Sequence, residues 1–274
     1  MKNCILFVTH QINDFIDAQL RKLILDLNND DTYELWVLFN TNDKIKSNTP
    51  YCNVFPFNFK TVQDAGFTLH RYYWYNSPLS FYGHNFEYSF MSFYKEHQEF
   101  DFYWLIEWDV YCNGNWKDLF TYYDNNHKDV DFYTTHISYG KNGNITDWQK
   151  DWAPLVTYHW IKTFSVNNDN VCRCFNPIDR FSNKALKILC DSYENGDYGF
   201  YEIAMPTIFI NNNLNIKAFG KTTEYIADNR FIDDYSDDHF EFINDDTDRY
   251  TPQFKYKNEL EPGKIYHPVK SFLI

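Results

Sequence analysis

The first forty residues contain two apolar segments separated by an amphipathic one, and this order constrains the fold more than any other feature. Residues 5–9, Ile-Leu-Phe-Val-Thr, predict a buried strand, and residues 33–39 predict a second strand. Between them, apolar side chains recur at helical spacing from Asp14 to Leu27. A strand, a helix and a strand in so short a stretch indicate a βαβ unit, so we expect a parallel sheet.

The rest of the chain continues this pattern and shows no internal repeat. Residues 100–110 give the clearest strand, because apolar residues fall on both of its faces, as in the centre of a parallel sheet. Further elements are expected at 54–55 (strand), 80–97 (helix), 114 onward (helix), 129–137 (strand), 182–194 (helix), and 203–210 and 216–219 (either type). We expect one α/β domain over residues 1–274, with a mixed, mostly parallel central sheet flanked by helices.

Charge and hydropathy restrict the partners and the location. The formal net charge of −13 repels a nucleic-acid backbone, so no nucleic acid is expected to bind. No apolar run approaches the roughly 18 residues that span a bilayer, and no signal peptide is visible. The six scattered cysteines are typical of reduced thiols. We expect a cytoplasmic protein without a transmembrane segment, and peripheral association with a membrane stays open.

Two acidic residues end the strand predicted over 100–110. Side chains alternate between the faces of a strand, so Glu107 and Asp109 are expected to point the same way. In open parallel sheets, ligands bind beyond the carboxyl ends of the strands. Two carboxylates there could hold a divalent cation that bridges two phosphates, or could bind ribose hydroxyls. The alternative is a strand end that emerges into water, where the acids have no function.

The same segment resembles a known family. Residues 103–110, followed by Gly114-Asn-Trp116, resemble the E-[YW]-D-V … G-x-W segment of a group of bacterial glycosyltransferase-like proteins. The resemblance implies a GT-A-like (Rossmann-like) fold in which Glu107 and Asp109 bind a sugar nucleotide, with Asp109 as a ligand of Mn2+ or Mg2+. Here Glu replaces the usual first Asp, and some GT-A families use no metal, so metal dependence stays open.

A second resemblance concerns residues 198–207. This segment is similar to the Glu-bearing segment before a helix in inverting GT-A enzymes, including the metal-independent core-2 branching N-acetylglucosaminyltransferases. The similarity implies that Glu202 is the catalytic base, which takes the proton of the acceptor hydroxyl as that hydroxyl attacks the anomeric carbon. The alternative is a helix N-terminal Glu that the helix dipole stabilises.

A third resemblance concerns the basic and imidazole groups of residues 264–270. The His-Pro-Val-Lys sequence is similar to the C-terminal segment of several such transferases, which implies that His267 ligates a metal and Lys270 contacts a donor phosphate. An exposed tail is the alternative. Arg71 and Arg180 are further candidates for phosphate binding, with surface ion pairs as their alternative role.

The remaining candidates concern the nucleobase and the acceptor. Thr9 and His10 follow the first strand, where a GT-A donor pocket meets the base, and this assignment rests on topology. Trp148 and Trp152 lie in a loop-rich stretch and could stack on an acceptor sugar, with core packing as the alternative.

Together these features predict a glycosyltransferase that moves a monosaccharide from a nucleotide-sugar donor to a glycan or lipid-linked glycan. Inversion is favoured because Glu202 offers a base, and a role in surface polysaccharide assembly is the family-level expectation. Residues 1–137 would form the nucleotide-sugar-binding half, and residues 138–274 the acceptor half with a C-terminal tail. The alternatives are a carbohydrate-binding or scaffold protein with an inactive transferase-like fold, and a glycoside hydrolase, which also uses paired carboxylates.

Overall fold

The fold is taken from a computed structural model of the chain. It describes residues 1–41, 52–68, 86–140, 172–197, 199, 201–219, 222–223, 231–233, 242–244 and 260–269. All statements below concern these residues.

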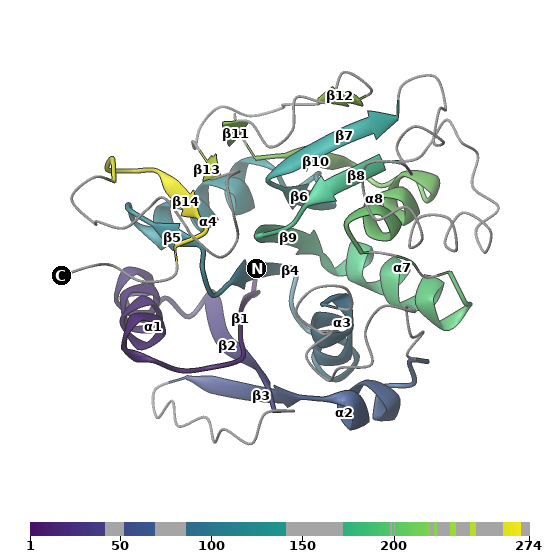
Figure 1. Ribbon diagram of the computed structural model, residues 1–274, viewed down its shortest axis with the longest axis horizontal. Coiled ribbons are helices and arrows are strands. Elements are labelled where there is room, and N and C mark those ends of the chain that lie inside the picture. Colours follow the sequence, from purple (N-terminus) through teal and green to yellow (C-terminus); the bar gives the residue numbers. More distant parts are fainter. Residues whose placement is uncertain are drawn as a thin grey trace.

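A seven-stranded sheet lies at the centre of the molecule, with the strand order β10-β6-β9-β4-β1-β2-β3 (Figure 1). Strand β9 runs antiparallel to both of its neighbours, β4 and β6, and the other pairs are parallel. The mixed, mostly parallel sheet is therefore confirmed. Its strands are β1 (Asn3–Thr9), β2 (Tyr33–Asn40), β3 (Asn53–Phe57), β4 (Phe102–Glu107), β6 (Phe132–Thr134), β9 (Ile178–Ser182) and β10 (Ile216–Ala218).

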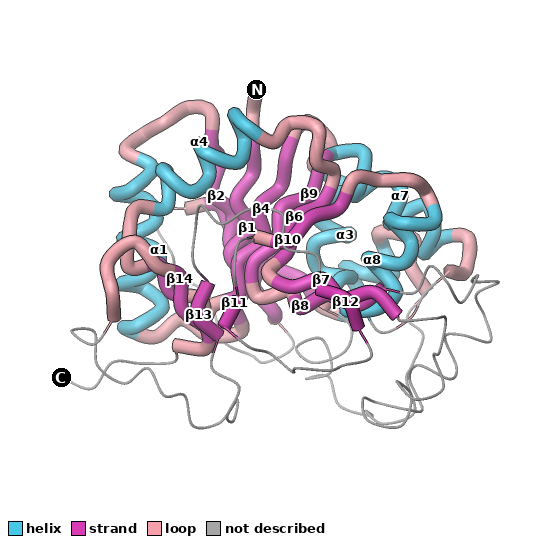
Figure 2. Tube along the Cα trace, turned by 90° about the horizontal axis from the view of Figure 1, so that it is seen from above, coloured by secondary structure: helices cyan, strands magenta, loops and turns pink. Residues whose placement is uncertain are grey.

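Helices cover both faces of this sheet. Figure 2 shows α1 (Asp14–Leu27) and α4 (Trp116–Asn126) on one side, and α3 (Glu87–Glu96), α7 (Asn183–Glu194) and α8 (Tyr201–Asn211) on the other. A short helix, α2 (Phe59–Asp64), follows β3. Strand β4 packs on both layers, because Trp104 and Ile106 join the core with α1 and α4 while Tyr103 and Leu105 join the other core. The two edge strands of the sheet, β3 and β10, come from the first and the last third of the chain. One sheet thus joins both parts, and the predicted single domain is confirmed.

Local sequence signals explain where the helices begin. The side chains of Asn13, Asn115 and Ser182 accept hydrogen bonds from the first-turn backbone N–H groups of α1, α4 and α7. The helix predicted from Asp14 is therefore confirmed, as are those expected from 114 onward and over 182–194. The segment 203–210 of undecided type is helical within α8, which is apolar all round because it is buried.

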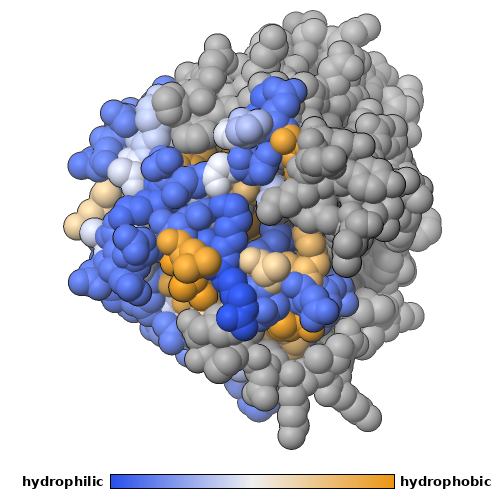
Figure 3. All heavy atoms as spheres, turned by 90° about the vertical axis from the view of Figure 1, so that its left-hand side faces the viewer, coloured by the Kyte–Doolittle hydropathy of each residue, from blue (hydrophilic) through white to orange (hydrophobic). Residues whose placement is uncertain are grey.

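The outer face of α1 faces water. Arg21 donates to Asp17 one turn away at 2.6 Å, which is a typical pair on an exposed helix face. In Figure 3, the described residues on the side of the molecule that carries α1 are largely hydrophilic, with separate hydrophobic patches between them. Ile16, Leu20, Leu23 and Leu27 of α1 are buried, which agrees with the amphipathic pattern predicted for residues 14–27.

Two small sheets lie at the end of the central sheet away from the N-terminus, where β1 and β4 end (Figure 2). One has the order β11-β13-β14-β5 and the other the order β12-β7-β8. The strand predicted over 129–137 is divided between the central sheet and one of these small sheets. The strands are β5 (Tyr111–Cys112), β7 (His136–Gly140), β8 (Cys172–Phe175), β11 (Thr222–Thr223), β12 (Phe231–Asp233), β13 (Phe242–Asn244) and β14 (Ile265–His267).

Two further observations concern the chain as a whole. Within the described ranges, no helix combines the length and the apolar character that crossing a membrane requires. All six cysteines are free thiols, and all but Cys52 are buried.

Candidate functional site

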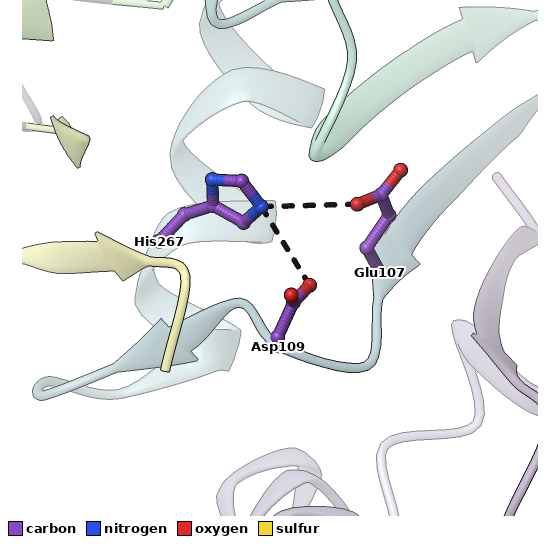
Figure 4. Close-up of side chains that lie close together, drawn as sticks. All are labelled: Glu107, Asp109 and His267. Carbon is purple, nitrogen blue, oxygen red and sulfur yellow. Dashed lines mark ion pairs between the residues drawn. The ribbon is translucent and has the colours of Figure 1, made fainter. Parts of the chain in front are cut away.

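The strand that leads to the site is shorter than predicted. Strand β4 ends at Glu107, and the N–H of Val110 donates to the Glu107 carbonyl at 3.1 Å, which closes a turn containing Trp108 and Asp109. Strand alternation is therefore the wrong reason for the direction of Asp109. The turn sets that direction, and it still brings Asp109 to the side where Glu107 lies (Figure 4).

His267 joins the two carboxylates from a distant part of the sequence (Figure 4). Its Nε2 lies 3.6 Å from Asp109 Oδ1 and 3.8 Å from Glu107 Oε2. His267 ends β14, which pairs antiparallel with β5 just after the Asp109 turn. The N–H of Val269 also donates to the Asp109 carbonyl at 2.7 Å. A hydrogen bond just after β14 therefore links this strand to the turn that carries Asp109.

The geometry of the three side chains fits a shared divalent cation. One ligand atom from each lies within 4.8 Å of the others. Atoms bonded about 2.1 Å from one ion stand roughly 3.0–4.2 Å apart, and both His267 distances fall in that interval. The side chains of Glu107, Asp109 and His267 are 27%, 8% and 10% exposed. Because water screens charges weakly at such partly buried positions, the two carboxylates repel each other there. Carboxylate oxygens suit Mg2+ and Mn2+, and imidazole nitrogen suits transition metals.

Residues that follow β1 or belong to α1 lie next to the turn that carries Trp108 and Asp109. Val8 pairs with Glu107, so the end of β1 lies beside the end of β4. His10, two residues further on, meets the edge of the Trp108 ring with centroids 5.5 Å apart. His10 thus lies beside the acidic motif, and its predicted contact with a base stays a prediction. Gln19 of α1 donates to the Trp108 carbonyl at 2.7 Å, a contact that the sequence did not suggest.

Thr9 is buried, and its hydroxyl is used within the chain. Its Oγ1 donates to the Gln11 carbonyl at 2.7 Å and so shapes the loop that carries His10. Thr9 therefore supports this loop through its side chain, and its contact with the donor stays a prediction.

Glu202 lies in α8 and is not part of the three-residue group. Its side chain is 3% exposed, and its backbone carbonyl lies 3.5 Å from Cys174 Sγ. Burial raises the pKa of the Asp179 carboxyl well above its usual range, and the nearby charge of Glu202 raises it further. Glu202 thus belongs to a second, buried acidic region beside β9.

Arg180 forms an ion pair inside the protein, so its candidacy as a phosphate ligand was wrong, and its alternative role as an ion pair is found, though not at the surface. Its side chain is 0% exposed, and its Nε donates to Asp124 Oδ1 at 2.7 Å. Burial raises the pKa of Asp124 and lowers that of Arg180, while the contact between the two opposes both shifts. The guanidinium also lies 3.5 Å from the centre of the Phe102 ring, so it is enclosed within the protein.

Gly114, Asn115 and Trp116, which follow the acidic motif, have structural roles. A Cβ at Gly114 would lie 3.2 Å from the Cα of Gly263, so only glycine allows this approach without a shift. Asn115 caps α4, and Trp116 is buried against α1. This part of the motif therefore packs the loop after β5 and does not reach the three-residue group.

Four predicted site residues fall outside the described ranges. They are Arg71, Trp148, Trp152 and Lys270. Their roles in donor and acceptor binding stay predictions.

Comparisons with known proteins gave structural likenesses only. No protein-family model matches the sequence, and no curated protein matches it. Mouse xyloside xylosyltransferase 1 is similar at 10% identity and a TM-score of 0.43, over 97% of this chain and 96% of that one. Glucosyl-3-phosphoglycerate synthase from Mycobacterium tuberculosis, solved with Mn2+, uridine diphosphate and phosphoglyceric acid, is similar at 12% identity and a TM-score of 0.42, over 79% and 67%. The galactosyltransferase LgtC, solved with donor and acceptor sugar analogs, is similar at 10% identity and a TM-score of 0.39, over 79% and 73%. Identity this low assigns no residue roles.

Proposed function

We propose that the chain is a nucleotide-sugar-dependent glycosyltransferase whose donor site is centred on Glu107, Asp109 and His267. The observation that carries the proposal is the convergence of two carboxylates and an imidazole at the carboxyl end of the central strand β4. Open α/β sheets bind ligands at this edge. A diphosphate reaches acidic side chains through a divalent cation, which the three ligand atoms are spaced to hold.

The chain's own residues supply ligands and walls for the donor. Glu107 and Asp109 would hold Mn2+ or Mg2+ through carboxylate oxygens, and His267 through Nε2. A bound cation supplies positive charge beside the leaving diphosphate. The edge-on pair of His10 and Trp108 lies beside this position and offers apolar surface for a nucleobase. Arg71 and Lys270 are proposed as further phosphate contacts.

We propose that transfer inverts the anomeric centre. The acceptor hydroxyl oxygen forms a bond to the anomeric carbon while the bond from that carbon to the diphosphate oxygen breaks. The nucleoside diphosphate leaves with the electron pair, and the hydroxyl proton passes to the carboxylate of Glu202. Glu202 lies close enough to Asp179 for its charge to raise the pKa of that buried carboxyl, so a second acid stands beside the proposed base.

The finer parts of the proposal concern the acceptor and the cellular role. We propose a glycan or lipid-linked glycan acceptor, with Trp148 and Trp152 stacking on its sugar rings, in cytoplasmic assembly of a surface polysaccharide. Residues 1–137 would then contribute most of the donor site, and residues 138–274 the acceptor side. A lipid-linked acceptor would bring the protein to a membrane surface.

A donor screen tests the proposal. Nucleotide release is measured with UDP-, GDP- and CMP-sugars, with and without EDTA, for wild type, Asp109→Ala, Glu202→Ala and the control Asp64→Ala, which changes an exposed acid of α2. We expect release with one donor class, a loss of roughly a hundredfold or more in Asp109→Ala, and full activity in the control. Glu202→Ala should lose transfer while the donor still raises its melting temperature.

Several results would contradict the proposal. Full turnover in Asp109→Ala would show that the donor site lies elsewhere. Activity unchanged in Glu202→Ala would remove the proposed base. Neither stabilisation nor release with any sugar nucleotide would favour a carbohydrate-binding protein, and monosaccharide release from a polymer without nucleotide would favour a hydrolase.

A further inference from the structure

The turn between β8 and β9 contacts two of the three proposed cation ligands. The carbonyl of Pro177 accepts a hydrogen bond from the N–H of Glu107 at 2.9 Å. The ring of Phe175 meets the ring of His267 edge-on, with centroids 5.4 Å apart and an interplanar angle of 65°. Glu107 belongs to the central sheet and His267 to a small sheet, so this turn is a physical link between ligands of different sheets.

Two consecutive buried threonines hold the same turn from behind. The Oγ1 atoms of Thr134 and Thr135 each donate to the carbonyl of Phe175 at 2.7 Å. Both residues are fully buried, at the point where the chain passes from β6 to β7. One carbonyl therefore receives two short hydrogen bonds away from water, where a lost bond leaves a costly unsatisfied group.

The middle residue of the turn, Asn176, is anchored by its own side chain. Its Nδ2 donates to both carboxyl oxygens of Asp179, at 3.0 and 3.1 Å. Its Oδ1 lies 3.1 Å from Cys174 Sγ, which has a proton to donate because burial raises the pKa of that thiol well above its usual range. These three residues are buried, so the turn has little freedom to move relative to β9.

We infer that the β8–β9 turn, residues 175–177, positions Glu107 and His267 for cation binding, with Thr134, Thr135 and Asp179 as its supports. This inference rests on the proposed cation site. The turn holds the backbone at Glu107 and limits the tilt of the His267 ring, so both ligands are restrained before an ion arrives. Groups that hydrogen-bond directly to metal ligands typically change metal affinity by about 10- to 100-fold when removed, and loss of this turn's contacts should act in the same direction.

A matched pair of threonine substitutions tests the inference. Thr135→Val removes one hydrogen bond from the turn at nearly constant volume. The control Thr207→Val removes an equally buried threonine hydroxyl that bonds to the backbone of Cys172, at the far end of β8. Each purified metal-free protein is titrated with Mn2+, free Mn2+ is followed by electron paramagnetic resonance, and thermal unfolding is recorded without metal.

We expect Thr135→Val to weaken Mn2+ binding about tenfold or more and the control to change it less than twofold, at similar melting temperatures. Phe175→Leu, which removes the ring edge beside His267, should also weaken binding and does not depend on the folding of the threonine variant. Equal affinity in wild type, Thr135→Val and Phe175→Leu would overturn the inference, as would equal weakening in Thr135→Val and Thr207→Val. Absence of Mn2+ binding by the wild type would instead reject the cation site of the proposed function.

Discussion

Glu87 allows a quantitative test of how burial changes the pKa of a carboxyl group in this fold, and through it the free energy of unfolding. It begins α3 and is fully buried, and its Oε1 accepts a hydrogen bond from the Tyr193 hydroxyl at 3.1 Å. Its other oxygen has no hydrogen-bond partner in the described part of the chain. Burial raises the pKa of Glu87 from 4.5 to about 8. The carboxyl is therefore neutral in the folded protein at neutral pH, while it is ionised in the unfolded chain.

The raised pKa makes stability depend on pH in a fixed direction. Because the folded state holds this proton more tightly, the contribution of Glu87 is fully present below pH 4.5 and is lost as pH rises to about 8. The free energy of unfolding falls by up to about 1.4 kcal/mol per pH unit in this window. Between pH 5 and pH 8 the loss from this one residue is roughly 3 to 4 kcal/mol.

Glu87→Gln should remove this pH dependence, because the amide stays neutral and keeps an oxygen for Tyr193. Urea unfolding near pH 5 and near pH 8 gives the difference in unfolding free energy between variant and wild type. We expect this difference to shift in favour of the variant by roughly 3 to 4 kcal/mol at the higher pH. The control Glu96→Gln, at the exposed other end of the same helix, should shift by less than about 0.5 kcal/mol. A pH-independent difference for Glu87→Gln would refute the reasoning.

Two further predictions concern structural residues. Arg180→Met should lower the free energy of unfolding by about 3–5 kcal/mol in urea, because it leaves Asp124 buried without its cationic partner. The affinity for Mn2+ should not change, and weaker Mn2+ binding at unchanged stability would contradict this. Asn115→Ala removes the cap of α4 and should lower the free energy of unfolding by about 1 kcal/mol, measured in the same way, and an unchanged value would show that the cap contributes nothing.

The parts of the fold that the sequence predicts are those with local signals. The helix from Asp14 has an apolar period and an Asn cap next to it, so its start could be read directly. Strand β9 could not, because Asp179 and Arg180 interrupt its apolar pattern. Both are buried, and Arg180 pairs with Asp124, which is remote in sequence. A local sequence pattern does not predict a partner of this kind.

The site was predicted in part, and for mixed reasons. Glu107 was found because an acid ends a buried strand, and Glu107 is the last residue of β4. Asp109 reaches the same place through a turn that strand periodicity does not describe. His267 entered through the resemblance of its segment. Phe175 and Thr135 were missed, because ring-edge contacts and bonds to backbone carbonyls leave no pattern in the sequence.

The docking of β14 on β5 has a consequence for the order of folding. His267 reaches the carboxylates only when Tyr266 pairs with Tyr111, a contact between residues far apart in the chain. Contacts of such long range form slowly, since a large loop must close before they add any stability. We therefore expect the third ligand to join the site after β1 and β2, which are near in sequence, have paired. An ion that needs all three ligands would bind only the folded protein. Its binding would therefore oppose the detachment of β14 from β5.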